Sequence, residues 1–270
     1  NCAGSVFEIG GGSGQLAEEV VKCSPDIHWT IVEPNPTHPG SGRINIIRSF
    51  FDKNFSLEKS VDAVVFSQVL EHAYDPKEFI ATIAGFLKPG GKLIFAYPQL
   101  KLWLERKYTN AINFEHTMLL TDVHIDSLLL SQYGLKTLDK REYNDHSFFY
   151  VVERTTEIIP AGEFANPYAE HKAIFQEFLG YHVGLISELN IKIADASAPV
   201  YLFGAHLFSQ YLIAFGLNTE KIAGIFDNSP KKQGKRLYGT NFSILSPKIL
   251  SDKGPVNVIL KAGIYNEEIK

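Results

Sequence analysis

Four glycines within five residues lie near the N-terminus, where a backbone without Cβ atoms could come close to a ligand. They are Gly10, Gly11, Gly12 and Gly14. The apolar residues 6–9 before them predict a buried strand, and residues 15–22 have the composition of a helix. A strand, a glycine-rich turn and a helix N-terminus together are typical of a nucleotide-binding site. We therefore expect a ligand at this turn.

The spacing of the glycines separates two kinds of nucleotide cofactor. The dinucleotide pattern G-x-G-x-x-G, begun at Gly10, needs a glycine at position 15, where Gln15 stands. The pattern present is Glu-x-Gly-x-Gly-x-Gly, and it begins at Glu8. This pattern resembles motif I of the class I S-adenosylmethionine methyltransferases, in which the glycine turn faces the methionine part of the cofactor. The resemblance implies that Glu8 and the four glycines bind S-adenosylmethionine.

Residues that follow three later strands would complete this site. Glu33 and Pro34 come directly after a predicted strand, and an acidic residue about 20 positions after such a turn suits the two hydroxyls of a ribose. Ser67 and Gln68 follow another strand, at the edge where open α/β sheets bind ligands. Asp52 or the aromatic pair Phe50 and Phe51 could border the adenine, although a core position for at least one of the two phenylalanines fits the sequence equally well.

The elements that would position these residues alternate along the chain, which predicts an α/β fold. The expected strands are 6–9, 28–32, 44–47, 61–66, 92–97, 136–142, 148–154, 200–203, 222–226 and 256–260. The expected helices are 15–22, 77–87, 122–133, 168–195 and one that ends at 215. The strand–turn–helix pattern restarts near Ala198, so we expect a second domain.

The domain boundaries follow from this restart and from turn-forming residues. We predict a Rossmann-like S-adenosylmethionine methyltransferase domain over residues 1–154 and a linker with a long helix over 155–197. The markers of the linker are Pro160, Gly162 and Pro167. A second, smaller Rossmann-like α/β domain is expected over 198–270.

The second domain has its own imitation of a nucleotide site. Gly204 follows a predicted strand, and Asp227 follows the next one, as in a dinucleotide-binding unit. The second and third glycines are missing, because residues 205–209 read Ala-His-Leu-Phe-Ser. We therefore expect a structural or substrate-contacting role here, and no NAD site.

Composition excludes several classes of function. The chain has 270 residues, a net charge of −4 and a pI near 6.2, which disfavours nucleic-acid partners. No apolar run approaches the ~18 residues of a membrane span. Cys2 and Cys23 are too few for a disulfide framework or an all-protein zinc site, so we expect a cytoplasmic protein without a metal. The chain begins at Asn1 without Met, and we expect an N-terminal portion to precede it.

Four stretches resemble the sugar C-methyltransferases, which methylate carbon on nucleotide-linked keto-deoxysugars. They are EIGGGSG at 8–14, FEHTMLL at 114–120, HSFFYVVER at 146–154 and, most specifically, VYLFGAHLFSQYLIAFGL with IAGIFDNSPKKQGKRLYGTNFSILSPKIL at 200–250. The resemblance covers nearly the whole chain. It implies S-adenosylmethionine as cofactor and a sugar nucleotide as the small-molecule substrate.

The chain departs from this family at several positions. Asn113 and Phe114 stand where the family has the Tyr and first His of a Tyr-His-Glu-His segment. Ser147 and Phe148 replace two glycines after His146. The cysteine-rich zinc domain of the family has no counterpart in this sequence, and the chain ends where the family continues into a helix. These departures imply that the acceptor could differ from the usual sugar.

Methylation of carbon needs a base, because a proton next to a carbonyl must be removed first. By resemblance to the catalytic His of the family, His116 is our candidate, and Glu115 could orient it or bind substrate hydroxyls. The alternative is that His116 is an ordinary polar residue. His72, in the segment after the fourth strand, could cap a helix or touch the substrate, and His146 is a second candidate for substrate contact.

Three functions remain open from the sequence. The first is C-methylation of a nucleotide-linked sugar, and the second is O- or N-methylation of another carbohydrate or natural product. The third is a non-catalytic subunit that binds S-adenosylmethionine. The intact glycine turn and Glu33 argue against the third, whereas Asn113 in place of Tyr weakens the first relative to the second. The oligomeric state does not follow from the sequence.

Overall fold

The computed structural model describes residues 4–157 and 164–260, and the chain falls into two compact units. The first unit is Asn1–Leu102 with Phe114–Asn166, and the second is Trp103–Asn113 with Pro167–Lys270. Each unit has its own sheet flanked by helices, in agreement with the expected α/β class.

The finer division into residues 1–154, 155–197 and 198–270 stays a prediction. Two of its markers, Pro160 and Gly162, lie outside the described residues. The same holds for Cys2 and for the chain end at 261–270.

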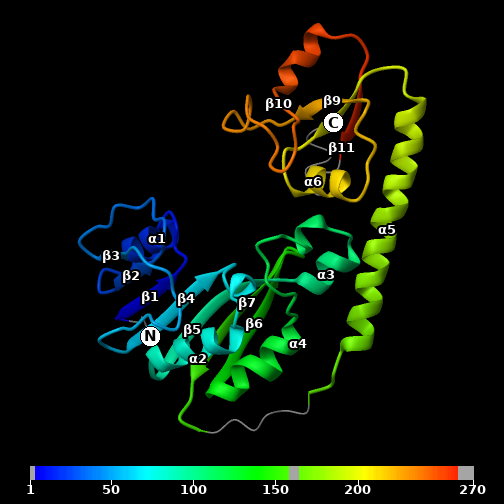
Figure 1. Cartoon of the computed structure of the whole chain (residues 1–270). Coiled ribbons are helices and arrows are strands. Elements are labelled where there is room, and N and C mark those ends of the chain that lie inside the picture. The colour runs from blue at the N-terminus through cyan, green and yellow to red at the C-terminus, as the bar shows by residue number, and fades with distance from the viewer. Residues whose placement is uncertain (1–3, 158–163, 261–270) are drawn as a thin grey trace. The chain divides into compact units, whose positions relative to one another are not determined.

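The first unit is built on a seven-stranded sheet in the order β3-β2-β1-β4-β5-β7-β6 (Figure 1). Its strands are β1 Ser5–Ile9, β2 His28–Val32, β3 Ile44–Ile47, β4 Val61–Ser67, β5 Leu87–Pro98, β6 Leu135–Tyr143 and β7 Ser147–Arg154. The first five strands run parallel, and β7 is antiparallel to β5 and β6. Strand order reverses between β1 and β4, so their carboxyl ends border the crevice in which open α/β sheets bind ligands.

The central strands of this sheet are buried on both faces, which explains their continuous apolar sequences. Residues 6–9 of β1 and 63–66 of β4 are all buried. Ala17 and Val21 of helix α1 (Gln15–Cys23) join the same core cluster as Val6 and Val65. The glycine turn therefore connects a fixed strand to a fixed helix.

Helix α2 (Pro76–Phe86) has the start that its sequence predicts. The Asp75 side chain accepts a hydrogen bond from the backbone N–H of Glu78 at 2.9 Å, and Pro76 occupies the first turn. Its end differs from the expectation, because Leu87 belongs to β5. The segment expected to stop the helix lies inside β5, where the pairing with β4 shifts register between Val61 and Ala63.

Residues 122–133, expected as one amphipathic helix, are helical throughout but change their hydrogen-bond pattern. Helix α4 (Asp122–His124) leads into a π-helical turn, Ile125–Leu130, and then a 3₁₀ turn, Ser131–Tyr133. Ile125, Leu129 and Leu130 supply its buried face. The apolar pattern was therefore informative about burial but not about the type of helical turn.

The second unit carries a parallel four-stranded sheet in the order β10-β9-β8-β11. Its strands are β8 Val200–Phe203, β9 Ile222–Phe226, β10 Ile244–Leu245 and β11 Asn257–Leu260. The helices are α5 Tyr168–Asp195 and α6 Leu207–Ala214, and α3 (Leu100–Glu105) spans the boundary between the units. Ile186 and Ile193 of α5 pack in one core cluster with Leu202 of β8 and Ile225 of β9.

Candidate functional site

The glycine turn follows β1 with a backbone that only glycine adopts easily. Gly10, Gly12 and Gly14 have φ values of 75°, 45° and 71°. The N–H of Gly10 donates to the carbonyl of Val32 at 2.9 Å, and the N–H of Gly14 donates to the carbonyl of Gly11 at 2.8 Å. The first bond holds the turn against the end of β2, and the second closes the turn on itself.

The space around each glycine shows which one can face a ligand. A Cβ at Gly11 would lie 2.7 Å from Ile31 Cγ2 and 2.8 Å from Glu8 Cδ, so Gly11 is needed for packing. A Cβ at Gly12 would meet only the carbonyl oxygen of Gly10, at 4.0 Å. Gly12 therefore borders open space at the crevice, as a cofactor contact requires.

Glu8 lies beneath this turn and is almost fully buried, with 7% of its surface exposed. Its Oε2 accepts a hydrogen bond from Trp29 Nε1 at 2.7 Å. Burial raises the pKa of Glu8, and the Trp29 hydrogen bond opposes this effect. Glu8 thus packs against the turn at Gly11. A direct contact of Glu8 with the cofactor stays a prediction.

Glu33 follows β2, one strand away from the glycine turn. Its N–H donates to the carbonyl of Ile47 at 3.0 Å, and its Oε1 accepts from the N–H of Asn35 at 2.9 Å. The loop after it, which begins with the exposed Pro34, returns to the turn through a hydrogen bond from Thr37 N–H to the carbonyl of Gly12 at 3.2 Å. The structure thus brings the predicted ribose carboxylate and the glycine turn to one sheet edge.

Ser67 and Gln68 mark the other side of the crevice, at the end of β4. Gln68 has a φ of 54°, which is uncommon for a residue with a side chain and often marks functional sites. Its Nε2 donates to Ser147 Oγ at 3.0 Å, and that hydroxyl also lies 2.6 Å from His146 Nδ1. His146 itself is exposed. Its predicted contact with substrate is not tested by these distances.

Phe51 lies in an aromatic cluster under the sheet rather than alone at the edge. Its ring centroid is 6.2 Å from that of Phe7, 5.5 Å from that of Phe55 and 5.3 Å from that of Phe79. The adjacent Phe50 is 72% exposed. Phe51 is thus half-buried and packed against other aromatic rings, and its contact with adenine stays a prediction.

A carboxylate and an imidazole from the segment after β4 meet a second imidazole from later in the chain. Glu71 and His72 belong to a 3₁₀ turn, Leu70–His72, and His116 comes from a distant segment of the same unit. One ligand-type atom from each of the three side chains lies within 4.8 Å of the other two. We call these three residues the Glu–His cluster. Sequence reasoning named both histidines but missed Glu71.

Hydrogen bonds to backbone carbonyls hold the two segments of the Glu–His cluster together. The N–H of Thr117 donates to the carbonyl of Glu71 at 3.0 Å, and its Oγ1 donates to the carbonyl of Ala73 at 2.6 Å. His72 Nδ1 lies 2.9 Å from the carbonyl oxygen of Glu115, so this nitrogen must carry the proton and donate. The Glu115 backbone thus orients His72, while the exposed Glu115 side chain keeps only a predicted role.

Glu71 is the unusual member of the Glu–His cluster. It is only 1% exposed, and its Oε2 has no hydrogen-bond partner among the residues that the structure describes. Burial raises the pKa of Glu71 to about 7, because removal from water disfavours the carboxylate. Perturbed buried carboxyl groups at a sheet edge are typical of functional sites.

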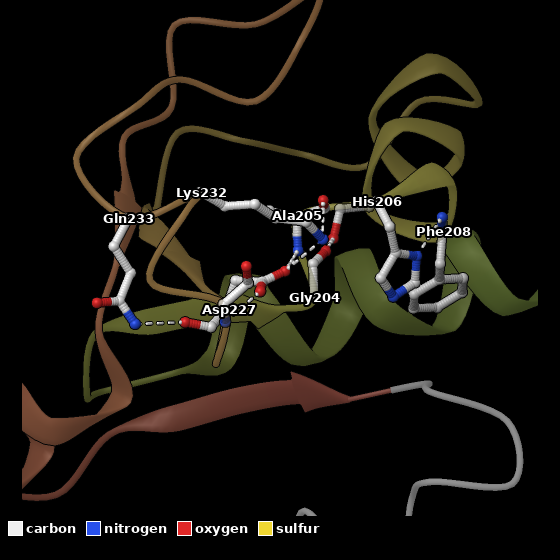
Figure 2. Close-up of polar contacts among 9 residues, drawn as sticks. Gly204, Ala205, His206, Phe208, Asp227, Lys232 and Gln233 are labelled. Atoms are coloured by element: carbon white, nitrogen blue, oxygen red, sulfur yellow. Dashed lines mark hydrogen bonds and ion pairs between the residues drawn. The ribbon is translucent and has the colours of Figure 1, made fainter. Parts of the chain in front are cut away.

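In the second unit, residues of the protein itself contact the groups around Gly204 and Asp227 that resemble a nucleotide site (Figure 2). The Asp227 carboxylate accepts from Ala205 N–H at 2.9 Å, Ser229 N–H at 2.8 Å and Lys232 Nζ at 3.0 Å. Burial acts to raise the pKa of Asp227, but these hydrogen bonds hold it below its ordinary value. His206 covers the turn, because its Nε2 would be 2.4 Å from a Cβ at Gly204. The carboxylate is engaged in holding the loop.

We predict that NAD and NADP do not bind this turn and that Asp227 has a structural role. Asp227→Ala should lower the free energy of unfolding by about 1–3 kcal/mol, since it leaves the buried N–H of Ala205 and the part-buried N–H of Ser229 without their acceptor. Urea unfolding measures this effect, with the exposed Asp252→Ala as the control in the same unit. Tight NAD binding that disappears in Asp227→Ala would contradict the prediction.

Comparison with known proteins gives a family match to the first unit. Residues 2–151 match the family model described as "Methyltransferase domain". Over 98 residues the chain is 28% identical to the ubiquinone biosynthesis O-methyltransferase of Coxiella burnetii strain Dugway 5J108-111, a match that covers 34% of this chain and 42% of that protein. A similar protein from Xanthomonas axonopodis is also 28% identical, over 101 residues, covering 34% of this chain and 41% of that protein. The chain thus spans about two fifths of the length of these relatives.

Solved structures also resemble the chain, at low sequence identity. Human N-acetylserotonin methyltransferase in complex with S-adenosylmethionine aligns with a TM-score of 0.48 and 17% identity over 57% of this chain and 48% of that one. The N-methyltransferase NodS from Bradyrhizobium japonicum aligns with a TM-score of 0.43 and 18% identity, over 57% and 87% of the two chains. Within residues 4–157 and 164–260, no helix combines the length and apolar character that a membrane crossing requires.

Proposed function

Since the chain belongs to the methyltransferase domain family, we propose that it transfers a methyl group from S-adenosylmethionine to a small-molecule acceptor at the edge of its seven-stranded sheet. The observation that carries this proposal is the glycine turn at the β1–β4 reversal, where Gly12 borders open space and Glu33 follows the neighbouring strand β2. Methyl transfer from a sulfonium is an in-line displacement. The protein mainly positions the two reactants and excludes water.

The acceptor that we propose is a carbon atom next to the ketone of a nucleotide-linked deoxysugar. The sequence of the second unit supports this acceptor, because residues 200–250 resemble the C-terminal domain of enzymes with that substrate. The Glu–His cluster also supports it, since methylation there requires removal of a C–H proton. Of its members, His116 is the residue that we expect to promote this step.

An oxygen acceptor is the second candidate, and the comparisons favour it specifically. The two curated relatives are named as O-methyltransferases of ubiquinone biosynthesis. A hydroxyl acceptor would also lose a proton, so the same cluster would serve it. The two candidates differ in the atom that is methylated.

Mass spectrometry after incubation with methyl-deuterated S-adenosylmethionine tests the proposal. The full chain is offered nucleotide-linked keto-deoxysugars beside phenols and sugar hydroxyls. We expect one labelled methyl group on carbon of the keto-sugar. Labelling confined to a hydroxyl would establish the second candidate, and labelling of protein or nucleic acid alone would contradict the small-molecule proposal.

A further inference from the structure

The Glu–His cluster has the composition of a metal-binding site. One carboxylate oxygen and two imidazole nitrogens are a ligand set used by catalytic zinc sites, where three protein ligands leave a position for water or substrate. Glu71 is buried, while His72 and His116 are half-buried, so a cation there could be reached from solvent. The ligand atoms come from two segments, and the hydrogen bonds of Thr117 to the carbonyls of Glu71 and Ala73 join these segments.

The protonation of His72 leaves the right nitrogen for such a cation. Its Nδ1–H donates to the Glu115 carbonyl at 2.9 Å, which makes Nε2 the nitrogen with the lone pair. Metal-bound histidines commonly donate their other ring N–H to a backbone carbonyl, because this fixes the tautomer and the ring orientation. The hydrogen bond from His72 to the Glu115 carbonyl is therefore the one that a metal-bound histidine commonly makes.

The second, independent observation is the buried Glu71 carboxyl. Its Oε2 has no hydrogen-bond partner within the described part of the chain, although the residue is 1% exposed. A buried polar group without a partner is unfavourable, and a buried carboxylate is usually paired or bound to a metal. The ring of His116 lies 5.2 Å from that of His72, centroid to centroid, so both imidazoles border this carboxyl.

We infer that Glu71, His72 and His116 bind a divalent cation of the Zn²⁺ type. Binding of the cation does not depend on the proposed function, but the role that we give the cation in methyl transfer rests on it. Ligand atoms around zinc lie about 2.0–2.2 Å from the ion, hence roughly 3.5 Å from one another, so side-chain shifts of about 1 Å would close the present spacing. A ligand set of imidazole and carboxylate suits zinc better than magnesium, because magnesium prefers sites made of oxygen ligands alone.

The cation would act on the acceptor's oxygen, and His116 would then be a ligand rather than the base. An acceptor hydroxyl, or the carbonyl beside an acidic carbon, would become more acidic when its oxygen is bound to the cation. The acceptor proton leaves to water. The methyl carbon forms its bond to the acceptor's electron pair as the sulfur–carbon bond breaks, and its electrons stay on sulfur. This role fits the place of Glu71 and His72, which lie on the segment that follows β4.

The test is a Zn²⁺ titration of the full chain without an affinity tag. A chelator first removes any bound metal, and the chelator is then removed from the sample. Calorimetry and elemental analysis should show one equivalent bound per chain. Glu71→Gln and His72→Asn should each weaken binding about tenfold or more. Two matched controls, His28→Asn and Cys23→Ser, remove an exposed imidazole and an exposed thiol and should leave the affinity unchanged.

The outcomes separate this inference from the proposed function. S-adenosylmethionine affinity and circular dichroism show that each variant is folded, and if Glu71→Gln does not fold, His72→Asn decides. Absence of Zn²⁺ binding in the folded parent, or equal binding in the folded variants, would overturn the inference. Methyl transfer that persists with chelator present would leave the proposed function intact. Zn²⁺ bound at one equivalent without methyl transfer to any acceptor would support the site and contradict the function.

Discussion

Gly12→Val should weaken S-adenosylmethionine binding about tenfold or more, which is at least ~1.4 kcal/mol. A side chain at Gly12 would enter the open space at the crevice, where the nearest contact of a Cβ is a carbonyl oxygen 4.0 Å away. Titration calorimetry of the full chain measures this loss. Gly12 has a φ of 45°, so a side chain there also strains the backbone. The effect of this strain must be separated from the loss of the contact with the cofactor.

Gly90→Val is the matched control for that backbone cost. Gly90 has a φ of 76°, and a Cβ added to it would meet no atom within 4 Å, but it lies in β5, away from the glycine turn. A side chain in this backbone region costs about 1–2 kcal/mol of conformational energy at either position. Gly90→Val should therefore lose stability while it keeps its cofactor affinity. Unchanged affinity in both variants would mean that the cofactor lies elsewhere.

His116→Asn should lower turnover by ~10²-fold or more, the usual contribution of a group that promotes proton removal. Asparagine keeps polarity and approximate size but lacks the imidazole that either takes the proton or holds a cation. S-adenosylmethionine affinity should remain nearly unchanged, because the glycine turn and Glu33 lie on other strand ends. Steady-state kinetics with calorimetry on the same sample measure both quantities.

The exposed His28→Asn serves as the control for this prediction, with turnover expected at the parent level. For a carbon acceptor, His116→Asn should also lose exchange of the substrate's proton with deuterated water, measured without cofactor. If both turnover and exchange survive, His116 has no part in proton removal. Survival would also remove the main support for the Glu–His cluster as the catalytic centre.

Local sequence signals were sufficient for much of the fold. The strands β2, β8 and β9 and the helix α5 begin and end where the sequence predicts, because apolar runs there are bounded by polar or turn-forming residues. The prediction was wrong at the start of β5. Pro89 and the two glycines after it looked like a turn, but pairing with β4 makes them an irregular part of the strand. Tertiary pairing decided this case.

The candidate site divides in the same way. The glycine turn, Glu33 and Gln68 were visible because each follows a strand, and parallel strands bring their carboxyl ends to one edge. Glu71 was missed because its burial depends on a segment 46 residues later in the chain, which Thr117 attaches to it. A signal was present in the adjacent pair of Glu71 and His72 at a strand end. Only the fold shows that His116 joins them.

Amide hydrogen exchange with and without S-adenosylhomocysteine tests the location of the cofactor site most directly. The measurement needs no variant and reads the whole chain at once. The account predicts slower exchange in peptides that contain residues 10–14, 33–37 and 67–69, with little change in residues 204–209 and 227–233. Protection confined to the second unit, or no protection at the glycine turn under saturating ligand, would contradict it.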